Sequence, residues 1–168
     1  MPKGYWFFAA ALLIFGVLGW FNSPLSLDGR PVLLLPDVKR VETYRLQASR
    51  WVKQLSTLEG QSAVLLSGNR SDPLTLSRKA QRLYLDSIGL FEEVDTSLVP
   101  QVLTGVHQRI QECVQGQLEV TQNLLLWTSD PNELTHAAAL TSLESLREEL
   151  AALKNNAWMQ GLDFKGIP

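Results

Sequence analysis

The stretch VETYRLQASRWVKQLSTLEGQSAVL, residues 41–65, decides the fold of this chain. Its apolar and small residues recur at alternating spacings of three and four, which places them on one face of an α-helix. This face consists of Val41, Tyr44, Ala48, Trp51, Leu55, Leu58, Ser62 and Leu65. We expect the helix to begin near Pro36 or Asp37 and to bury this face against other helices.

Two more helices of the same kind are predicted next along the chain. One starts after Asp72 as N-cap, with Pro73 in its first turn, where the missing amide hydrogen costs nothing. Its apolar face is Leu76, Ala80, Leu83, Ser87, Leu90 and Val94. The other is expected to begin at Thr96 or Ser97, to tolerate a proline in its first turn and to run to about Trp127.

A fourth helix is predicted after the sequence SDPNE, residues 129–133. Asp130 is expected to cap its free amides, and Glu133 to reach back to the start of the helix. Asn155 and Asn156 are expected to end it. Its apolar face keeps heptad spacing through Ala139, Leu143, Leu146, Leu150 and Leu153.

A different pattern occupies the N-terminus, where YWFFAAALLIFGVLGWF, residues 5–21, contains no charged residue. A helix of this length rises about 25 Å and, with its flanking residues, is long enough to cross a bilayer once. Aromatic residues at both ends of the run are typical of the two membrane surfaces. The main anchor residues are Tyr5, Trp6, Phe7, Phe8, Leu12, Leu13, Ile14, Phe15, Trp20 and Phe21.

The flanking charges predict how this anchor is oriented. Lys3 and the terminal amine favour a cytoplasmic N-terminus, which places the bundle outside the cytoplasm. The alternative is a signal peptide that is cleaved near Gly19, which would release a soluble bundle. Val17 and Gly19 form a poor small-residue pair for such a cleavage site.

These patterns predict an all-α chain, in which a single N-terminal transmembrane helix precedes an up-down-up-down four-helix bundle. We expect an anchor at 1–21, an irregular connector at 22–36 rich in proline and glycine, the bundle at 37–157 and an irregular C-terminal tail at 158–168. Small residues on the apolar faces would let helices approach closely, so no room for a large cofactor is expected.

Composition and charge exclude some classes of function. The formal net charge is −2 and no concentrated basic patch is present, which argues against nucleic acid as a partner. Cys113, the one cysteine, lies among apolar helix positions and is expected to be a buried structural thiol. Bases outnumber acids in residues 37–59 and acids outnumber bases in residues 98–156, which predicts either complementarity within the bundle or an acidic face for a basic partner.

The chain has two histidines, and both are by residue type candidate ligands for a metal or a haem. A di-iron bundle needs two Glu-x-x-His motifs, but Glu133 and His136 form the one motif present, because Thr104 stands where His107 would need a glutamate. The two histidines are also predicted to lie about 24 Å apart, too far to share a haem. Glu133 and His136, with Trp127 nearby, remain the candidates for a small-ligand or metal site.

No phosphate loop, zinc spacing or nucleophile motif is present, so catalytic activity and a bound cofactor are not expected. The sequence instead predicts a single-pass membrane protein that displays a helical bundle as an interaction, scaffold or sensory module. Its expected partners are the lipid bilayer, through residues 5–21, and a protein. The alternative is a bundle that binds a small ligand or a metal, either tethered or secreted.

Overall fold

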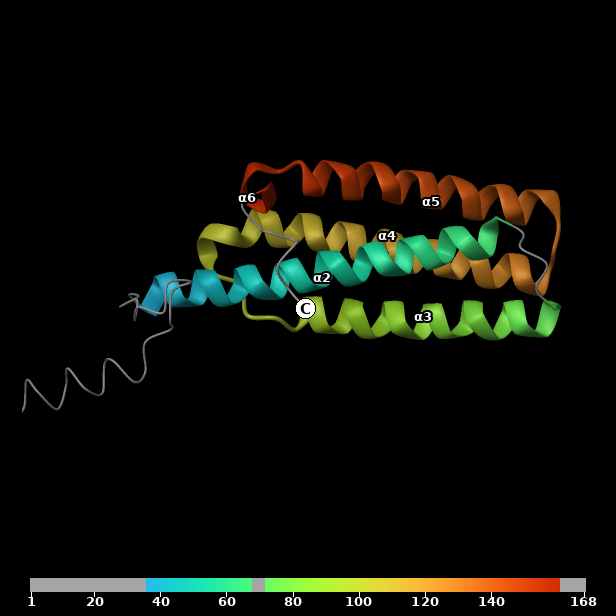
Figure 1. The fold of residues 1–168 in the computed structure, drawn as a ribbon, viewed down its shortest axis with the longest axis horizontal. Helices are drawn as coiled ribbons and strands as arrows, with labels where there is room; N and C mark the ends of the chain where they lie inside the picture. The colour runs from blue at the N-terminus through green and yellow to red at the C-terminus, as the bar shows by residue number, and fades with distance from the viewer. Residues whose placement is uncertain (1–35, 68–71, 161–168) are drawn as a thin grey trace, which may run out of the picture. The chain divides into compact units, whose positions relative to one another are not determined.

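The computed structural model describes residues 36–67 and 72–160, and within these ranges all regular structure is helical (Figure 1). The predicted all-α class is confirmed for this part of the chain. None of the helices described is long and apolar enough to cross a membrane. The expected anchor at 5–21 lies outside the described residues. The elements are α2 (Pro36–Leu66), α3 (Pro73–Asp95), η1 (Gln101–Leu103), α4 (Thr104–Ser129), α5 (Glu133–Lys154) and α6 (Ala157–Gln160).

Four long helices pack side by side and alternate in direction, as the up-down-up-down order requires. The hairpins α3–α4 and α4–α5 are antiparallel by their connections (Figure 1). Contacts of α2 fix its direction as well. Glu59 of α2 contacts Arg147 of α5, and Leu66, further along α2, contacts His136, which comes earlier in α5. These two helices therefore also run antiparallel.

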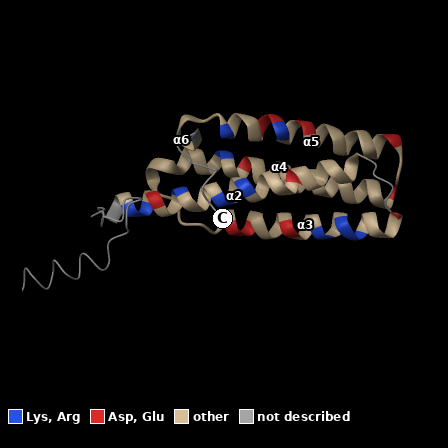
Figure 2. Ribbon diagram, in the orientation of Figure 1, with Lys and Arg blue, Asp and Glu red and all other residues tan. Residues whose placement is uncertain are grey.

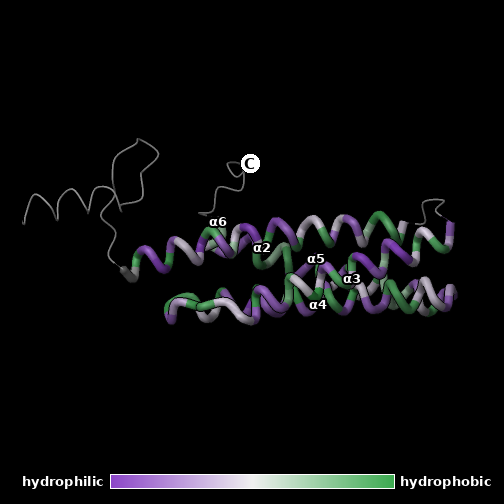
Figure 3. The backbone as a smooth tube through the Cα atoms, turned by 90° about the horizontal axis from the view of Figure 1, so that it is seen from below, coloured by the Kyte–Doolittle hydropathy of each residue, from purple (hydrophilic) through white to green (hydrophobic). Residues whose placement is uncertain are grey.

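The predicted apolar faces form the core. Apolar and polar positions alternate along each helix (Figure 3), and the seam of α2 is buried from Tyr44 to Leu65. Full burial of one leucine side chain stabilises the fold by about 1.5–3 kcal/mol, so these faces supply most of the driving force. The small residues of the seams are completely inaccessible to solvent: Ala48, Ser62, Ala80, Ser87 and Ala139.

Both serines of this group satisfy their hydroxyls within their own helix. The Ser62 hydroxyl donates to the Leu58 carbonyl at 2.9 Å, and that of Ser87 donates to the Leu83 carbonyl at 2.8 Å. A buried hydroxyl that has a partner avoids the desolvation cost of an unmade hydrogen bond. Serine therefore acts here as a small residue that fits the space between helices.

The start of α3 agrees with the prediction and the start of α5 does not. Asp72 caps α3 by accepting a hydrogen bond from the Thr75 amide at 3.3 Å. At α5 the predicted Asp130 cap is wrong, because the helix begins at Glu133 and Asn132 is the N-cap.

Asn132 and Thr135 form a reciprocal capping box. The Asn132 Oδ1 atom accepts from the Thr135 amide at 2.9 Å, and the Thr135 hydroxyl accepts from the Asn132 amide at 3.3 Å. Asp130 instead ends α4 as its C-cap, and its carboxylate accepts from the Asn132 side-chain amide at 2.9 Å. The role predicted for Glu133 is thus filled by Thr135.

The predicted start of the third bundle helix at Thr96 or Ser97 is also wrong. Thr96 is the C-cap of α3, and α4 begins at Thr104 after the short helix η1. Pro100 explains the difference, since a proline disfavours helical backbone in the residue before it. The backbone at Pro100 is extended, and its carbonyl accepts from the Leu103 amide at 2.8 Å to close η1.

The C-terminal region departs from the prediction at its beginning. Asn155 ends α5 as expected, but α6 follows where an irregular tail was predicted from residue 158. The Asn156 side chain accepts from the Trp158 amide at 3.0 Å, which starts this short helix. Met159 is fully buried, so α6 adds to the core.

The identity of the α5 cap gives a test by stability. Asn132→Ala removes the side-chain oxygen that accepts from the Thr135 amide and should lower the free energy of unfolding by about 1 kcal/mol. Asp130→Ala removes one exposed hydrogen bond and should cost less than half as much. Urea unfolding of both variants would decide between the two caps, and a larger loss for Asp130→Ala would contradict the structure.

Candidate functional site

The predicted candidate His136 lies near the turn between α4 and α5 and bonds to the end of α2. Its Nε2 atom is 3.1 Å from the carbonyl oxygen of Leu66, the last residue of α2. The carbonyl accepts, so Nε2 carries the hydrogen, and one of the carbonyls left unpaired at a helix C-terminus gains a partner. The ring also contacts Trp127, with 4.9 Å between ring centroids. His136 therefore joins three helices.

Glu133, the other candidate ligand, is exposed in the first turn of α5. Within residues 36–67 and 72–160, no group of three or more His, Cys, Asp or Glu side chains is placed to hold a metal ion. A metal at His136 would have to bind through Nδ1, because Nε2 is engaged with Leu66. The described geometry gives His136 a structural role.

A second cluster, not predicted from the sequence, surrounds His107 in the first turns of α4. The Tyr44 hydroxyl lies 2.9 Å from His107 Nδ1, and both side chains are buried. The ring centroid of Trp51 is 5.8 Å from that of Tyr44, and the ring centroid of Trp158 in α6 is 6.2 Å from that of Tyr44. Four aromatic side chains from α2, α4 and α6 therefore meet at one end of the bundle.

Burial controls protonation in this cluster. It raises the pKa of Tyr44 to about 12 and lowers the pKa of His107, an effect that the Asp95 carboxylate partly opposes. The Tyr44 phenol therefore stays protonated and the His107 imidazole stays neutral near pH 7. A hydrogen bond forms between the Tyr44 hydroxyl and His107 Nδ1 in this state. The Trp51 Nε1 atom is buried and has no hydrogen-bond partner among the described residues.

Cys113 is buried, as predicted for a structural thiol. Burial, followed by the nearby carboxylates of Glu149 and Glu112, raises its pKa to about 11. The thiolate is the reactive form of cysteine, so a protonated and buried Cys113 is a poor nucleophile.

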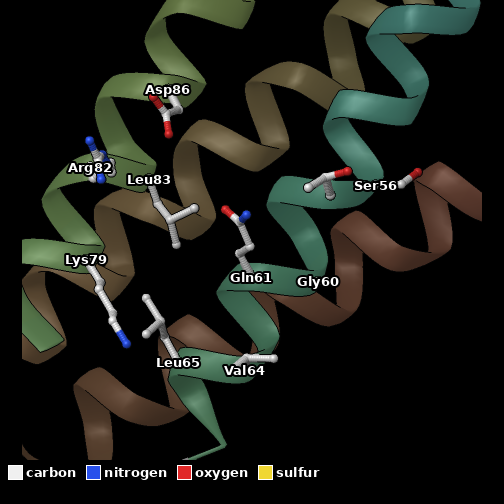
Figure 4. Close-up of a pocket in the computed structure, with 10 residues that line it drawn as sticks. Ser56, Gly60, Gln61, Val64, Leu65, Lys79, Arg82, Leu83 and Asp86 are labelled. Carbon is white, nitrogen blue, oxygen red and sulfur yellow. The ribbon is translucent and has the colours of Figure 1, made fainter. Parts of the chain in front are cut away.

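A groove with a volume of about 550 Å³ lies between α2 and α3 (Figure 4). Leu65 and Leu83 form its apolar floor, and Val64 contributes an apolar wall that is 59% exposed. Gly60 leaves open space in the groove, because a Cβ atom there would have no neighbour within 4 Å. The remaining lining residues are polar or charged: Ser56, Thr57, Gln61, Lys79, Arg82 and Asp86.

The charges on this groove are predominantly positive. Within the described ranges, Lys79 and Arg82 form no ion pair or side-chain hydrogen bond. The basic residues of α3 lie in its N-terminal half, next to the groove, and the acidic ones gather toward its C-terminal end (Figure 2). Among the described residues, Asp86 is the one acid that lines the groove.

The predicted division of charge between the halves of the bundle is only partly reflected in its ion pairs. Arg50 of α2 pairs with Glu93 of α3, within the first two helices. Glu59 of α2 accepts from Arg147 of α5 at 2.6 Å, so here the acid lies on the basic half. On α5, burial raises the pKa of the Glu149 carboxyl, and the nearby carboxylates of Glu112 and Glu119 raise it further.

Comparisons with protein families, with curated proteins and with solved structures found no match to this chain.

Sequence spacing identified His136 but missed the partner of His107, because Tyr44 is 63 residues away along the chain. It also missed the groove, whose cations occupy ordinary exposed helix positions. Their one sequence signal is the run of bases on the N-terminal half of α3.

The buried His107 predicts a loss of stability in acid. In the unfolded chain this histidine binds a proton near its ordinary pKa of about 6.5, but in the bundle it does so at a lower pH. Stability is therefore lost as the pH falls through the unfolded pKa toward the folded one. The melting temperature of the wild type should fall more between about pH 7.5 and about pH 5.5 than that of His107→Gln.

The matched control is His136→Gln, which keeps His107, so the pH response assigned to His107 should remain in that variant. An equal loss of melting temperature in the wild type and in His107→Gln would contradict the assignment to His107.

Proposed function

We propose that this chain is a membrane-tethered interaction module, in which residues 5–21 cross the bilayer and the bundle binds a partner protein in the α2–α3 groove. The tether is inferred from residues 5–21, which contain no charged residue and have aromatic residues at both ends. The N-terminus would be cytoplasmic and the bundle extracytoplasmic. The groove, an apolar floor flanked by Lys79 and Arg82, which have no ion-pair partner within residues 36–67 and 72–160, is the observation that carries the binding role.

The groove fits a helical segment of a partner. From Ser56 to Leu65, α2 extends about 14 Å along it, which corresponds to between two and three turns of a bound helix. An amphipathic helix recognises such a groove by laying its apolar stripe on the floor. Leu65 and Leu83 provide the floor, and Gly60 would allow the partner backbone to approach closely.

Charge favours an acidic partner segment. Lys79 and Arg82 lack partners within the described bundle, and Asp86 offsets one of these charges. Acidic side chains beside the apolar stripe of the partner would pair with these cations, which raises the association rate and rejects basic competitors. The chain as a whole has a net charge of −2, so this positive site is a local feature.

The tether is tested by alkaline extraction of membranes and by protease treatment of intact cells. The full chain should resist extraction, and its bundle should be digested only from outside the cytoplasm. A shortened, soluble product would instead indicate that the N-terminal run is cleaved.

The groove is tested by photocrosslinking in living cells, with a photoreactive amino acid at Gln61, which is exposed and lines the groove. We expect a discrete protein adduct. Arg82→Glu should reduce its yield at least about fivefold, because the new carboxylate would repel the acidic side chain of the partner that Arg82 attracts. Arg78→Glu is the matched control, because Arg78 is also exposed on α3 but does not line the groove. Equal adduct yields in both variants would rule out the groove as the binding site.

Gly60 allows a test in which binding and stability change in opposite directions. A Cβ atom has open space at both Gly60 and Gly89, so leucine at either helical position should stabilise the bundle by about 0.5–1 kcal/mol. Only Gly60→Leu places a side chain in the groove and should weaken the Gln61 adduct. If thermal melts show both variants intact and their adducts are equal, the partner does not occupy the groove.

A further inference from the structure

The segment between α3 and α4 exposes two large aliphatic side chains to solvent. Leu98 is 93% exposed and Val102 is 80% exposed. They lie within TSLVPQVLTGVHQ, residues 96–108, which contains no charged residue. We call Leu98 to Val102 the apolar tip.

The backbone of the apolar tip is held by hydrogen bonds. On its N-terminal side, the Ser97 hydroxyl donates to the Val94 carbonyl at 2.8 Å. On its C-terminal side, the Leu103 amide donates to the Pro100 carbonyl at 2.8 Å and the Leu103 side chain is buried. Anchored at both sides, the segment presents Leu98 and Val102 to solvent while Leu103 faces the core.

The apolar tip lies at the end where the chain enters the body of the bundle. The compact unit begins at Thr43, and the next residue, Tyr44, bonds to His107, only a few residues beyond Val102. Residues that precede Thr43 therefore join the bundle at this end. The opposite end, at the α4–α5 turn, is one length of α4 away, 26 residues or about 39 Å.

The connecting segments at the two ends differ in charge, although Glu92, Glu93 and Asp95 stand at the end of α3 just before the apolar tip. The α4–α5 turn contains Asp130, and Glu133 follows it in α5. The apolar tip has no charged residue within its own segment. An exposed, uncharged, aliphatic surface at the attachment end is suited to the boundary between lipid headgroups and acyl chains.

We propose that the apolar tip inserts into the surface of the bilayer that residues 5–21 cross, with Leu98 and Val102 among the lipid chains. This inference rests on the tether proposed above. Tethering holds the tip at a high effective concentration beside the membrane, so two aliphatic side chains are enough to keep it there.

The test uses the full chain in phosphatidylcholine vesicles, with an environment-sensitive fluorophore on Leu98→Cys. Leu134→Cys is the matched control, because Leu134 is 83% exposed and lies beyond the α4–α5 turn at the opposite end. The native Cys113 is buried, so an unsubstituted chain should take up little label. Quenching by lipids that carry a nitroxide on the acyl chain reports insertion.

We expect emission from position 98 to be blue-shifted and quenched severalfold more than emission from position 134. Adding Val102→Asp to Leu98→Cys should remove most of that quenching. Vesicles that bind both labelled proteins but leave both fluorophores in water would overturn the tip insertion and leave the tether intact. If neither protein floats with the vesicles, the tether itself fails, and the insertion that rests on it fails too.

Discussion

The register of α2 against α4 is the constraint on which the other contacts depend. Two buried polar contacts set it: Tyr44 with His107, and the Gln117 side-chain amide, which donates to the Ser62 hydroxyl at 3.2 Å. A shift by one turn would leave Tyr44, His107 and the Gln117 side-chain amide buried without these partners, at a cost of about 1–3 kcal/mol for each. The Ser62 hydroxyl would keep its bond to the Leu58 carbonyl. Apolar contacts alone tolerate such a shift far better, because leucine faces repeat every turn. The polar contacts therefore select one arrangement from several of similar burial.

Once this register is set, the surface features of α2 follow from it. Arg50 meets Glu93 toward one end of the α2–α3 pair, and Glu59 meets Arg147 on the side of α5. Between residues 56 and 65, α2 presents no basic or acidic side chain to the groove, so Lys79 and Arg82 find no partner across from them. The groove and its positive charge thus arise from one cause, a polar but uncharged stretch of α2 beside a basic stretch of α3.

Sequence spacing predicted the fold well where the information was local or periodic. Heptad positions identified the buried faces, and Asp72 followed by Pro73 marked the start of α3 correctly. It failed where two local signals compete: Asp130 and Asn132 both have capping side chains, and only the path of the chain past Pro131 selects Asn132. Spacing also cannot pair His107 with Tyr44, because their contact depends on how two faces meet in three dimensions. For the same reason it predicted a filled bundle but not the groove on its surface.

The positions of the groove and the apolar tip together define how a partner would approach. Gly60 lies sixteen residues beyond Tyr44 along α2, a rise of about 24 Å. If the apolar tip rests on the bilayer and the bundle stands upright on it, the groove lies well above the headgroups, where a partner can reach it without entering the membrane. The ionic attraction of Lys79 and Arg82 acts over about 8–10 Å at physiological salt, so at this height membrane charge has little influence on it. Under the proposed tip insertion, recognition in the groove would therefore depend on the partner rather than on the composition of the lipid.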